Sequence, residues 1–436
     1  YTVRHVRTWR TQRFTAVMVL GYALLALGTT SIVTGLVLAW QAAFGRRIGP
    51  TWYLVHLVGG IAIAVLLAVH LGLAFVRRRP PAGVPWPAFV VAVRRFTLRN
   101  AVVVAGAAAI VFGTAAWWPS RPIALPLPEG YTLPAFSQNF DEYRGNPFAP
   151  TYARTADGML VNSAVLSSSA SCGTSGCHEQ ILAEWEPSAH RFAAMNPPFQ
   201  KIQRDFAADR EPAETRYCAG CHDPISLFAG AKDIHTLDLS APGMQEGISC
   251  AVCHSISAAD ERGNADYVLT PPREYLWTGE DGLRKQASDF LIRAYPRQHL
   301  ADYDRNILRS PMFCGACHKQ FIPEALNRFG MAPAQNQYDE WRQSHWHTDD
   351  PSTDLSCRDC HMRLVDSIDP GRGEGGDQRR TQDDRAHRHH GTIATNMLMP
   401  EVLELPHWEE QVRLTIEWIR GETIIPEIRE LWPEGP

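Results

Sequence analysis

All ten cysteines of this 436-residue chain stand in five close pairs, and each pair is followed directly by a histidine. Four pairs have the spacing C-x-x-C-H, and the first is stretched to C-x-x-x-x-C-H. The pattern is typical of haem c attachment, in which both cysteines bond the haem and the histidine binds its iron. Zinc ribbons and disulfide frameworks do not require a histidine after every pair. The predicted attachment residues are Cys172, Cys177 and His178; Cys218, Cys221 and His222; Cys250, Cys253 and His254; Cys314, Cys317 and His318; and Cys357, Cys360 and His361.

Five covalent haems constrain the part of the chain that holds them, because porphyrins then supply much of its core. The motifs are spread between about Thr151 and Pro400, with segments broken by glycine and proline between them. We therefore predict a mainly α fold in which a haem-packed outer domain, residues 151–400, has short helices and much irregular structure. An extended, proline-rich linker is predicted before it, at 119–150. A C-terminal helical tail is predicted after it, at 401–436.

Three uncharged apolar runs precede the linker, at Phe14 to Trp40, Trp52 to Val76 and Ala101 to Trp118. A helix needs about 20 apolar residues to cross the hydrocarbon core of a bilayer, so the first two runs are long enough and the third is shorter. We predict a three-helix transmembrane anchor over residues 1–118. Between the second and third runs, Pro87 to Leu98 is predicted to form a short basic helix on the membrane surface.

Arginine is the only charged residue type before residue 122, and its positions predict the orientation of the anchor. Arginines gather before the first run and between the second and third, whereas the other connection has only Arg46 and Arg47. Basic loops stay in the cytoplasm, so the N-terminus is predicted to be cytoplasmic. Three crossings of the inner membrane then place the haem domain on the periplasmic side, where c-type haem is attached. The formal net charge of −4 indicates no nucleic-acid partner.

Histidines outside the motifs are the candidates for the second axial bond to each iron. Bis-histidine ligation is typical of low-potential electron transfer, whereas a methionine ligand raises the potential. The outer domain holds a good supply for five haems. These histidines are His190, His235, His299, His345, His347, His387, His389, His390 and His407.

The run CGTSGCHEQILAEWEPSAH resembles the periplasmic multihaem cytochromes c, pentahaem members included, in which Trp-x-x-Ser-x-His follows a haem motif. A similar run, WRQSH, precedes the last motif, and the late HRHHG is similar to the family's His-x-Phe-x-Gly. The resemblance covers about Asn146 to Pro400. It implies that the distal ligands are His190, His345 and His387, with His389 or His390 as alternatives to His387, and that His299 and His235 fill the two other places.

Two histidines, His56 and His70, fall inside the second apolar run. At fourteen residues apart they lie within about 40° of each other on a helix and about 21 Å apart along its axis. The run resembles part of a membrane dihaem cytochrome b, in which one helix binds two stacked haems. The other two runs contain no histidine, so second ligands to one or two haems b would come from a partner chain. A quinone site and a structural role are the alternatives.

The favoured function is a membrane-anchored cytochrome that carries electrons between the quinone pool, or a membrane redox subunit, and an outer redox protein. No catalytic residue is predicted beyond electron transfer, although quinol oxidation is left open. One alternative is a multihaem reductase or oxidase of a small nitrogen or sulfur compound, which requires an iron with an open position. The other is an electron-wiring subunit of a larger respiratory or photosynthetic complex, or of a homo-oligomer.

Overall fold

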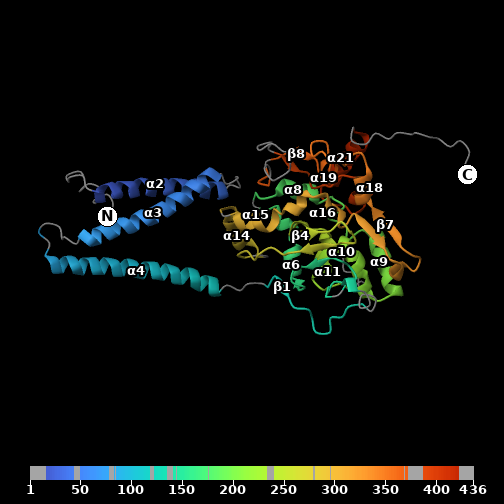
Figure 1. Ribbon diagram of the computed structural model, residues 1–436, viewed down its shortest axis with the longest axis horizontal. Coiled ribbons are helices and arrows are strands. Elements are labelled where there is room, and N and C mark those ends of the chain that lie inside the picture. The colour runs from blue at the N-terminus through green and yellow to red at the C-terminus, as the bar shows by residue number, and fades with distance from the viewer. Residues whose placement is uncertain are drawn as a thin grey trace, which may run out of the picture. The chain divides into compact units, whose positions relative to one another are not determined.

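The computed structural model separates the chain into two compact units, Tyr1–Arg121 and Pro122–Pro436 (Figure 1). Each unit is described by itself. The residues that the structure describes are 16–43, 50–77, 83, 85–117, 122–134, 141–143, 145–174, 176–232, 240–277, 280–294, 296–367, 369–371 and 386–421.

Three long helices make up the described part of the first unit: α2 (Ala16–Ala43), α3 (Pro50–Arg77) and α4 (Trp86–Trp117). Helices α2 and α3 pack side by side. The apolar side chains of α2 and α3 remain largely exposed, for example Ile32 and Leu36, each 66% exposed. A helix in the core of a soluble protein would bury such side chains, whereas a helix in lipid leaves them on its surface.

Two segments of the described residues, Met18–Ala42 and Thr51–His70, are long and apolar enough to cross a membrane. The structure therefore supports two candidate spans, not the three that the sequence predicts. The predicted third run lies in α4, which also includes the predicted surface helix Pro87 to Leu98 as one continuous helix. No proline or glycine separates these two parts, so the helix that holds the apolar run also carries a basic first half. Trp118 lies outside the described residues.

The second unit is built from short helices and irregular segments, as expected for a mainly α haem-binding domain. Its α-helices are α6 (Ser163–Leu166), α7 (Ser169–Cys172), α8 (Glu179–Trp185), α9 (Pro197–Asp209), α10 (Arg216–His222), α11 (Pro224–Phe228), α12 (Pro242–Glu246), α13 (Cys250–Ser255), α14 (Gly282–Ala294), α15 (Arg297–Tyr303), α16 (Pro311–Gly315), α17 (Glu324–Asn327), α18 (Gln337–Gln343), α19 (Cys357–His361), α20 (Leu398–Val402) and α21 (Trp408–Arg420). Short 3₁₀ segments are η1 (Asp141–Tyr143), η2 (Pro212–Thr215) and η3 (Asn306–Arg309).

Four very small sheets brace these helices. Strand β1 pairs with β3, β6 with β7 and β8 with β9, all antiparallel, while β5 lies between β2 and β4. In the β8–β9 pair Val365 stands opposite His387. The strands are β1 (Ala124–Leu125), β2 (Arg154–Thr155), β3 (Leu160–Val161), β4 (Ile256–Ala259), β5 (Tyr267–Leu269), β6 (Lys319–Ile322), β7 (Ala332–Asn336), β8 (Leu364–Asp366) and β9 (Ala386–Arg388).

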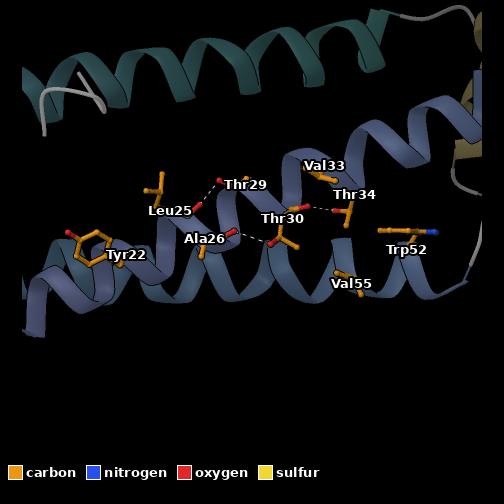
Figure 2. A pocket seen from close by; sticks show the side chains of 9 residues that line it. All are labelled: Tyr22, Leu25, Ala26, Thr29, Thr30, Val33, Thr34, Trp52 and Val55. Carbon is orange, nitrogen blue, oxygen red and sulfur yellow. Dashed lines mark hydrogen bonds between the residues drawn. The ribbon is translucent and has the colours of Figure 1, made fainter. Parts of the chain in front are cut away.

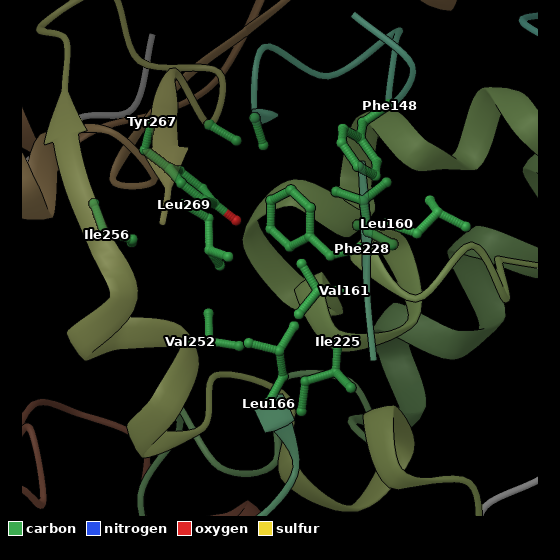
Figure 3. Close-up of a cluster of buried hydrophobic side chains, with 14 of the residues drawn as sticks. Phe148, Leu160, Val161, Leu166, Ile225, Phe228, Val252, Ile256, Tyr267 and Leu269 are labelled. Carbon is green, nitrogen blue, oxygen red and sulfur yellow. The ribbon is translucent and has the colours of Figure 1, made fainter. Parts of the chain in front are cut away.

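A hydrophobic core joins the segments around the second, third and fourth motifs (Figure 3). Phe148 and Phe228 meet edge to face, with ring centroids 4.9 Å apart, and Tyr267 packs against Phe228 from strand β5. Cys221 and Cys317 lie against this core. The apolar residues therefore fix the backbone that carries the attachment cysteines, rather than forming one large separate core.

The tail after the last motif returns to it. Helix α21 buries Trp418, whose indole Nε1 donates a hydrogen bond to the Cys360 carbonyl at 3.1 Å. The Trp418 ring also lies 5.3 Å from the ring of His361. The tail thus packs against the fifth motif. Residues 422–436, the end of the predicted tail, lie outside the described residues.

Candidate haem-binding sites

The four regular motifs stand on or directly after short helices, α10, α13, α16 and α19. Residues at i, i+3 and i+4 of a helix share one face, so a single turn brings both cysteines and the histidine together. In the fourth motif this turn is closed by the His318 amide, which donates to the Cys314 carbonyl at 2.9 Å. Local helix geometry therefore suffices to assemble each attachment site.

The stretched first motif forms the same hydrogen bond between its histidine amide and its first cysteine, although its backbone is not one continuous helical turn. Helix α7 ends at Cys172, and the chain then turns through Gly176, which has a left-handed backbone at φ +71°. The His178 amide donates to the Cys172 carbonyl at 2.9 Å, as its counterpart does in the fourth motif. The two extra residues are accommodated in the turn, so the histidine returns to the first cysteine.

All ten cysteines are half-buried, and none takes part in a disulfide. Cysteines of different motifs nevertheless meet. The side chain of Cys172 is hydrogen-bonded to that of Cys250, which joins the first motif to the third. Cys221 is bonded to Cys317, and Cys314 to Cys357, so the fourth motif contacts both the second and the fifth. Burial and, to a lesser extent, the neighbouring Cys250 and Cys317 raise the pKa of Cys253 to about 12, so the third motif lies near the fourth.

Three motif histidines face a second histidine at a distance that fits a shared iron. A metal–imidazole bond is about 2 Å and a ring nitrogen lies roughly 1.1 Å from its ring centre, so two axial rings should be about 6.2 Å apart. The measured centroid distances are 6.1, 6.4 and 6.2 Å, and the interplanar angles are 16°, 16° and 59°. These values belong to the pairs His178–His299, His254–His390 and His190–His318 respectively.

The ring nitrogens are oriented as in metal-bound histidines. His254 Nδ1 donates to the Tyr303 carbonyl at 3.0 Å, and His361 Nδ1 to the Ile393 carbonyl at 2.8 Å. His390 Nδ1 donates to the Arg388 carbonyl at 2.7 Å. A hydrogen bond of this kind fixes the tautomer and leaves Nε2 unprotonated, which is the form that binds iron.

Burial keeps the second histidines neutral. It lowers the pKa of His190 and of His299 to about 4, and that of His390 to about 3. A neutral imidazole is the form that can bind a metal ion. The three pairs therefore fit a bis-histidine haem in distance, and their second histidines fit it in charge.

At the second and fifth motifs, the motif histidine contacts an aromatic side chain. The His222 ring stacks on Phe199 at 4.3 Å, and within the described residues no histidine ring lies at an axial spacing from His222 or His361. The ring of His345 lies against Trp346, 4.1 Å away. His235 lies outside the described residues. Among the described histidines, His345 is thus not brought to either motif.

His387 occupies a different place from the one that the resemblance implied. Its buried Nε2 is 2.9 Å from both carboxylate oxygens of Glu184, while His390, three residues later, faces His254. Glu184 also accepts the backbone amide of His390 at 2.9 Å. The late HRHHG run supplies the partner of the third motif, but through a histidine that the sequence offered as the alternative.

In the first unit, His56 lies between α2 and α3. Its Nδ1 is 3.0 Å from Thr34 Oγ1, and Gly35 leaves room for the imidazole ring. Because the Thr34 hydroxyl already donates to the Thr30 carbonyl at 2.9 Å, His56 donates to Thr34 and its Nε2 keeps a lone pair. His70 has a buried Nδ1 with no hydrogen-bond partner among the described residues.

A cavity of about 640 Å³ opens beside Thr34, the residue that contacts His56 (Figure 2). Aromatic and hydroxyl side chains share its wall with aliphatic ones, a lining that suits a ring with polar substituents. It is lined by Tyr22, Leu25, Ala26, Thr29, Thr30, Val33, Thr34, Trp52 and Val55.

A family model described as cytochrome c554 and c-prime matches residues 171–255. This segment contains the first three motifs and the Trp-x-x-Ser-x-His run. Comparison with curated proteins and with solved structures gives no match. The family match supports a c-type cytochrome with covalently attached haem that transfers electrons.

Proposed function

We propose that this protein is a membrane-anchored pentahaem cytochrome c that carries electrons between the quinone pool, or a membrane redox subunit, and a redox protein on the outer side. The observation that carries the proposal is the set of three histidine pairs at the spacing of axial ligands. Each pair includes one motif histidine, and each lies beside its own two cysteines.

In this proposal His299 is the second ligand at the first motif, His390 at the third and His190 at the fourth. His235 and His345 are the remaining candidates, and we propose them for the second and fifth motifs. A haem c supplies an iron that gains or loses one electron while both axial ligands stay bound. The protein supplies the imidazoles that would bind the iron, and its cysteines would attach each porphyrin at two points.

Contacts between motif cysteines support conduction between the five sites. The contacts run from the first motif to the third and on to the fourth, and the fourth also meets the second and the fifth. The five proposed haems would therefore be neighbours in space, as conduction between them requires. This order differs from the order along the chain.

The quinone link of the proposal rests on the cavity beside Thr34 and His56. The Nε2 lone pair of His56 can accept a hydrogen bond from a quinol hydroxyl, or it can bind the iron of a haem b. A ligand shared with a partner chain would complete such a haem. The two apolar helices support a membrane anchor for either role.

We propose that the haem domain faces the periplasm, because c-type haem is attached on that side of the membrane. An alkaline phosphatase reporter fused after Gly421 should be active, and a green fluorescent protein at the same position should be dark. The opposite pair of readings would contradict this localisation.

A pyridine-haemochrome spectrum of the purified full-length protein tests the cofactor content. We expect five haems c for each chain, and any haem b appears as a separate band. Addition of a quinol to membranes that contain the protein tests the second half of the proposal. If the haems c stay oxidised with quinol but become reduced with dithionite, the quinone link is wrong and the haem count stands.

A second candidate function is supported by the surroundings of His222. Its ring stacks on Phe199, and the described residues place no second imidazole opposite it. An iron held there by one histidine would be open to nitrite, hydroxylamine or a sulfur compound. A high-spin haem signal that cyanide or nitrite shifts would favour this reductase function, and a fully low-spin spectrum would exclude it.

A further inference from the structure

The motif histidine of the first site is hydrogen-bonded to a buried carboxylate. His178 Nδ1 donates to Asp369 Oδ1 at 2.8 Å, and the Asp369 side chain is 0% exposed. The same oxygen accepts the Gly371 amide at 2.7 Å, and the Ser367 hydroxyl accepts the Asp369 amide at 3.0 Å. A segment that follows the fifth motif thereby fixes the ring of the first.

The other motif histidines are held differently. His254 and His361 donate to the neutral carbonyl groups of Tyr303 and Ile393. Within the described part of the chain, His178 is the motif histidine whose ring nitrogen meets a carboxylate. A carboxylate partner raises the basicity of a ligating imidazole more than a carbonyl does, and a basic ligand stabilises ferric iron.

We infer that Asp369 is a positioning residue that lowers the reduction potential of the haem at the first motif through His178. The carboxylate is shielded from water, so its charge acts on the imidazole with little screening. The rings of His178 and His299 are nearly parallel, 16° apart. The inference rests on the proposed haem at this motif.

Two cations lie near the first motif, but on its cysteine side. Arg293 Nη1 donates to Cys177 Sγ at 3.5 Å, and Lys285 Nζ donates to Asp289 at 2.5 Å. Neither is paired with Asp369 among the hydrogen bonds of the described residues. The inference concerns the shift that Asp369 causes through His178, rather than the absolute potential of this haem.

A lowered reduction potential at the first motif affects electron transfer to the motif that it contacts. Its cysteine contact leads to the third motif, so it stands at one end of the series of contacts. A lowered potential makes the haem at the first motif a stronger electron donor toward the third motif than it would be without Asp369.

The test is an optical redox titration of the full-length, haem-loaded protein and of Asp369→Asn. We expect the potential of one haem to rise, so that its ratio of reduced to oxidised form at a fixed potential increases at least about tenfold. Such a change corresponds to about 59 mV for one electron. His299→Met, which exchanges an axial imidazole for a thioether, should raise the same component and so assigns it to the first motif.

Asp302→Asn is the matched control. Asp302 is also buried and lies on α15 with His299, but it binds Arg273 and Tyr275 instead of a motif histidine. Asp302→Asn should shift the potential of the haem at the first motif much less. Asp369→Glu keeps a carboxylate and should give the wild-type potential. Should Asp369→Asn not accumulate, Asp369→Ser makes the same comparison.

An unchanged potential in Asp369→Asn, at a full count of five haems, would overturn the inference. An equal shift in Asp302→Asn would also overturn it, because any nearby charge would then suffice. A wild-type protein without haem at the first motif would instead contradict the proposed function.

Discussion

At the residue scale, the choice between His387 and His390 decides which side chain closes the third site. The ring centroids of His390 and His254 are 6.4 Å apart, whereas His387 is hydrogen-bonded to Glu184. We expect His390→Ala to convert one haem from low-spin to high-spin, because its iron loses an axial ligand. His387→Ala should leave the spin state unchanged.

Electron paramagnetic resonance and cyanide binding of the two purified variants measure this difference. The wild-type protein gives the baseline, and both variants must retain the same number of haems. A high-spin signal in His387→Ala and none in His390→Ala would reverse the assignment and return it to the histidine that the sequence resemblance favoured.

The attachment residues can be predicted from the sequence because their spacing is local, within one turn of chain. The sequence predicts the pool of second histidines but not their partners, since His299 and His178 meet only after folding. It also misses Asp369, which stands 191 residues from His178 and belongs to no motif. A buried second partner of this kind leaves no spacing pattern in the chain.

At the scale of elements, α21 contributes packing to the fifth site. Trp418 is buried against His361 and donates to the Cys360 carbonyl. We expect Trp418→Ala to lower the free energy of unfolding by about 3–5 kcal/mol, through lost burial and the cavity that remains. Trp418→Phe keeps the ring and loses the hydrogen bond, which should cost about 1 kcal/mol.

Denaturant unfolding followed by circular dichroism measures both changes. Ile419→Ala is the control, because the neighbouring side chain is 36% exposed and should change stability by less than about 0.5 kcal/mol. Equal losses in Trp418→Ala and Ile419→Ala would show that α21 does not pack on the fifth motif as described.

The helices also show where periodicity fails as a predictor. The apolar runs of α2 and α3 are recognisable from composition alone, since a membrane helix needs no tertiary partner to be apolar. The break expected after Leu98 does not exist, because nothing between the basic and apolar parts of α4 interrupts a helix. Inside the second unit, helices of four to seven residues carry too few turns for a helical period to appear.

At the scale of the whole molecule, contacts rather than chain order connect the five motifs. The fourth motif contacts the second and fifth through its cysteines and lies near the third, so we place it at the junction of the series. The sequence gives no sign of this arrangement, because the motifs are similar in form and are separated by segments of unrelated composition. Only the folded backbone brings Cys314 to Cys357 and Cys317 to Cys221.

Removal of the fourth haem should therefore interrupt electron transfer between the haems on either side of it. We expect Cys314→Ala combined with Cys317→Ala to leave four haems that dithionite reduces, while a quinol or a donor acting at one end reduces only the haems on its own side of the gap. The matched variant, Cys218→Ala with Cys221→Ala, removes a branch and should leave the remaining four in communication. Stopped-flow absorbance of membranes that contain each variant counts the haems reduced by each donor. Complete reduction by the same donor in both variants would show that electrons do not need the fourth site.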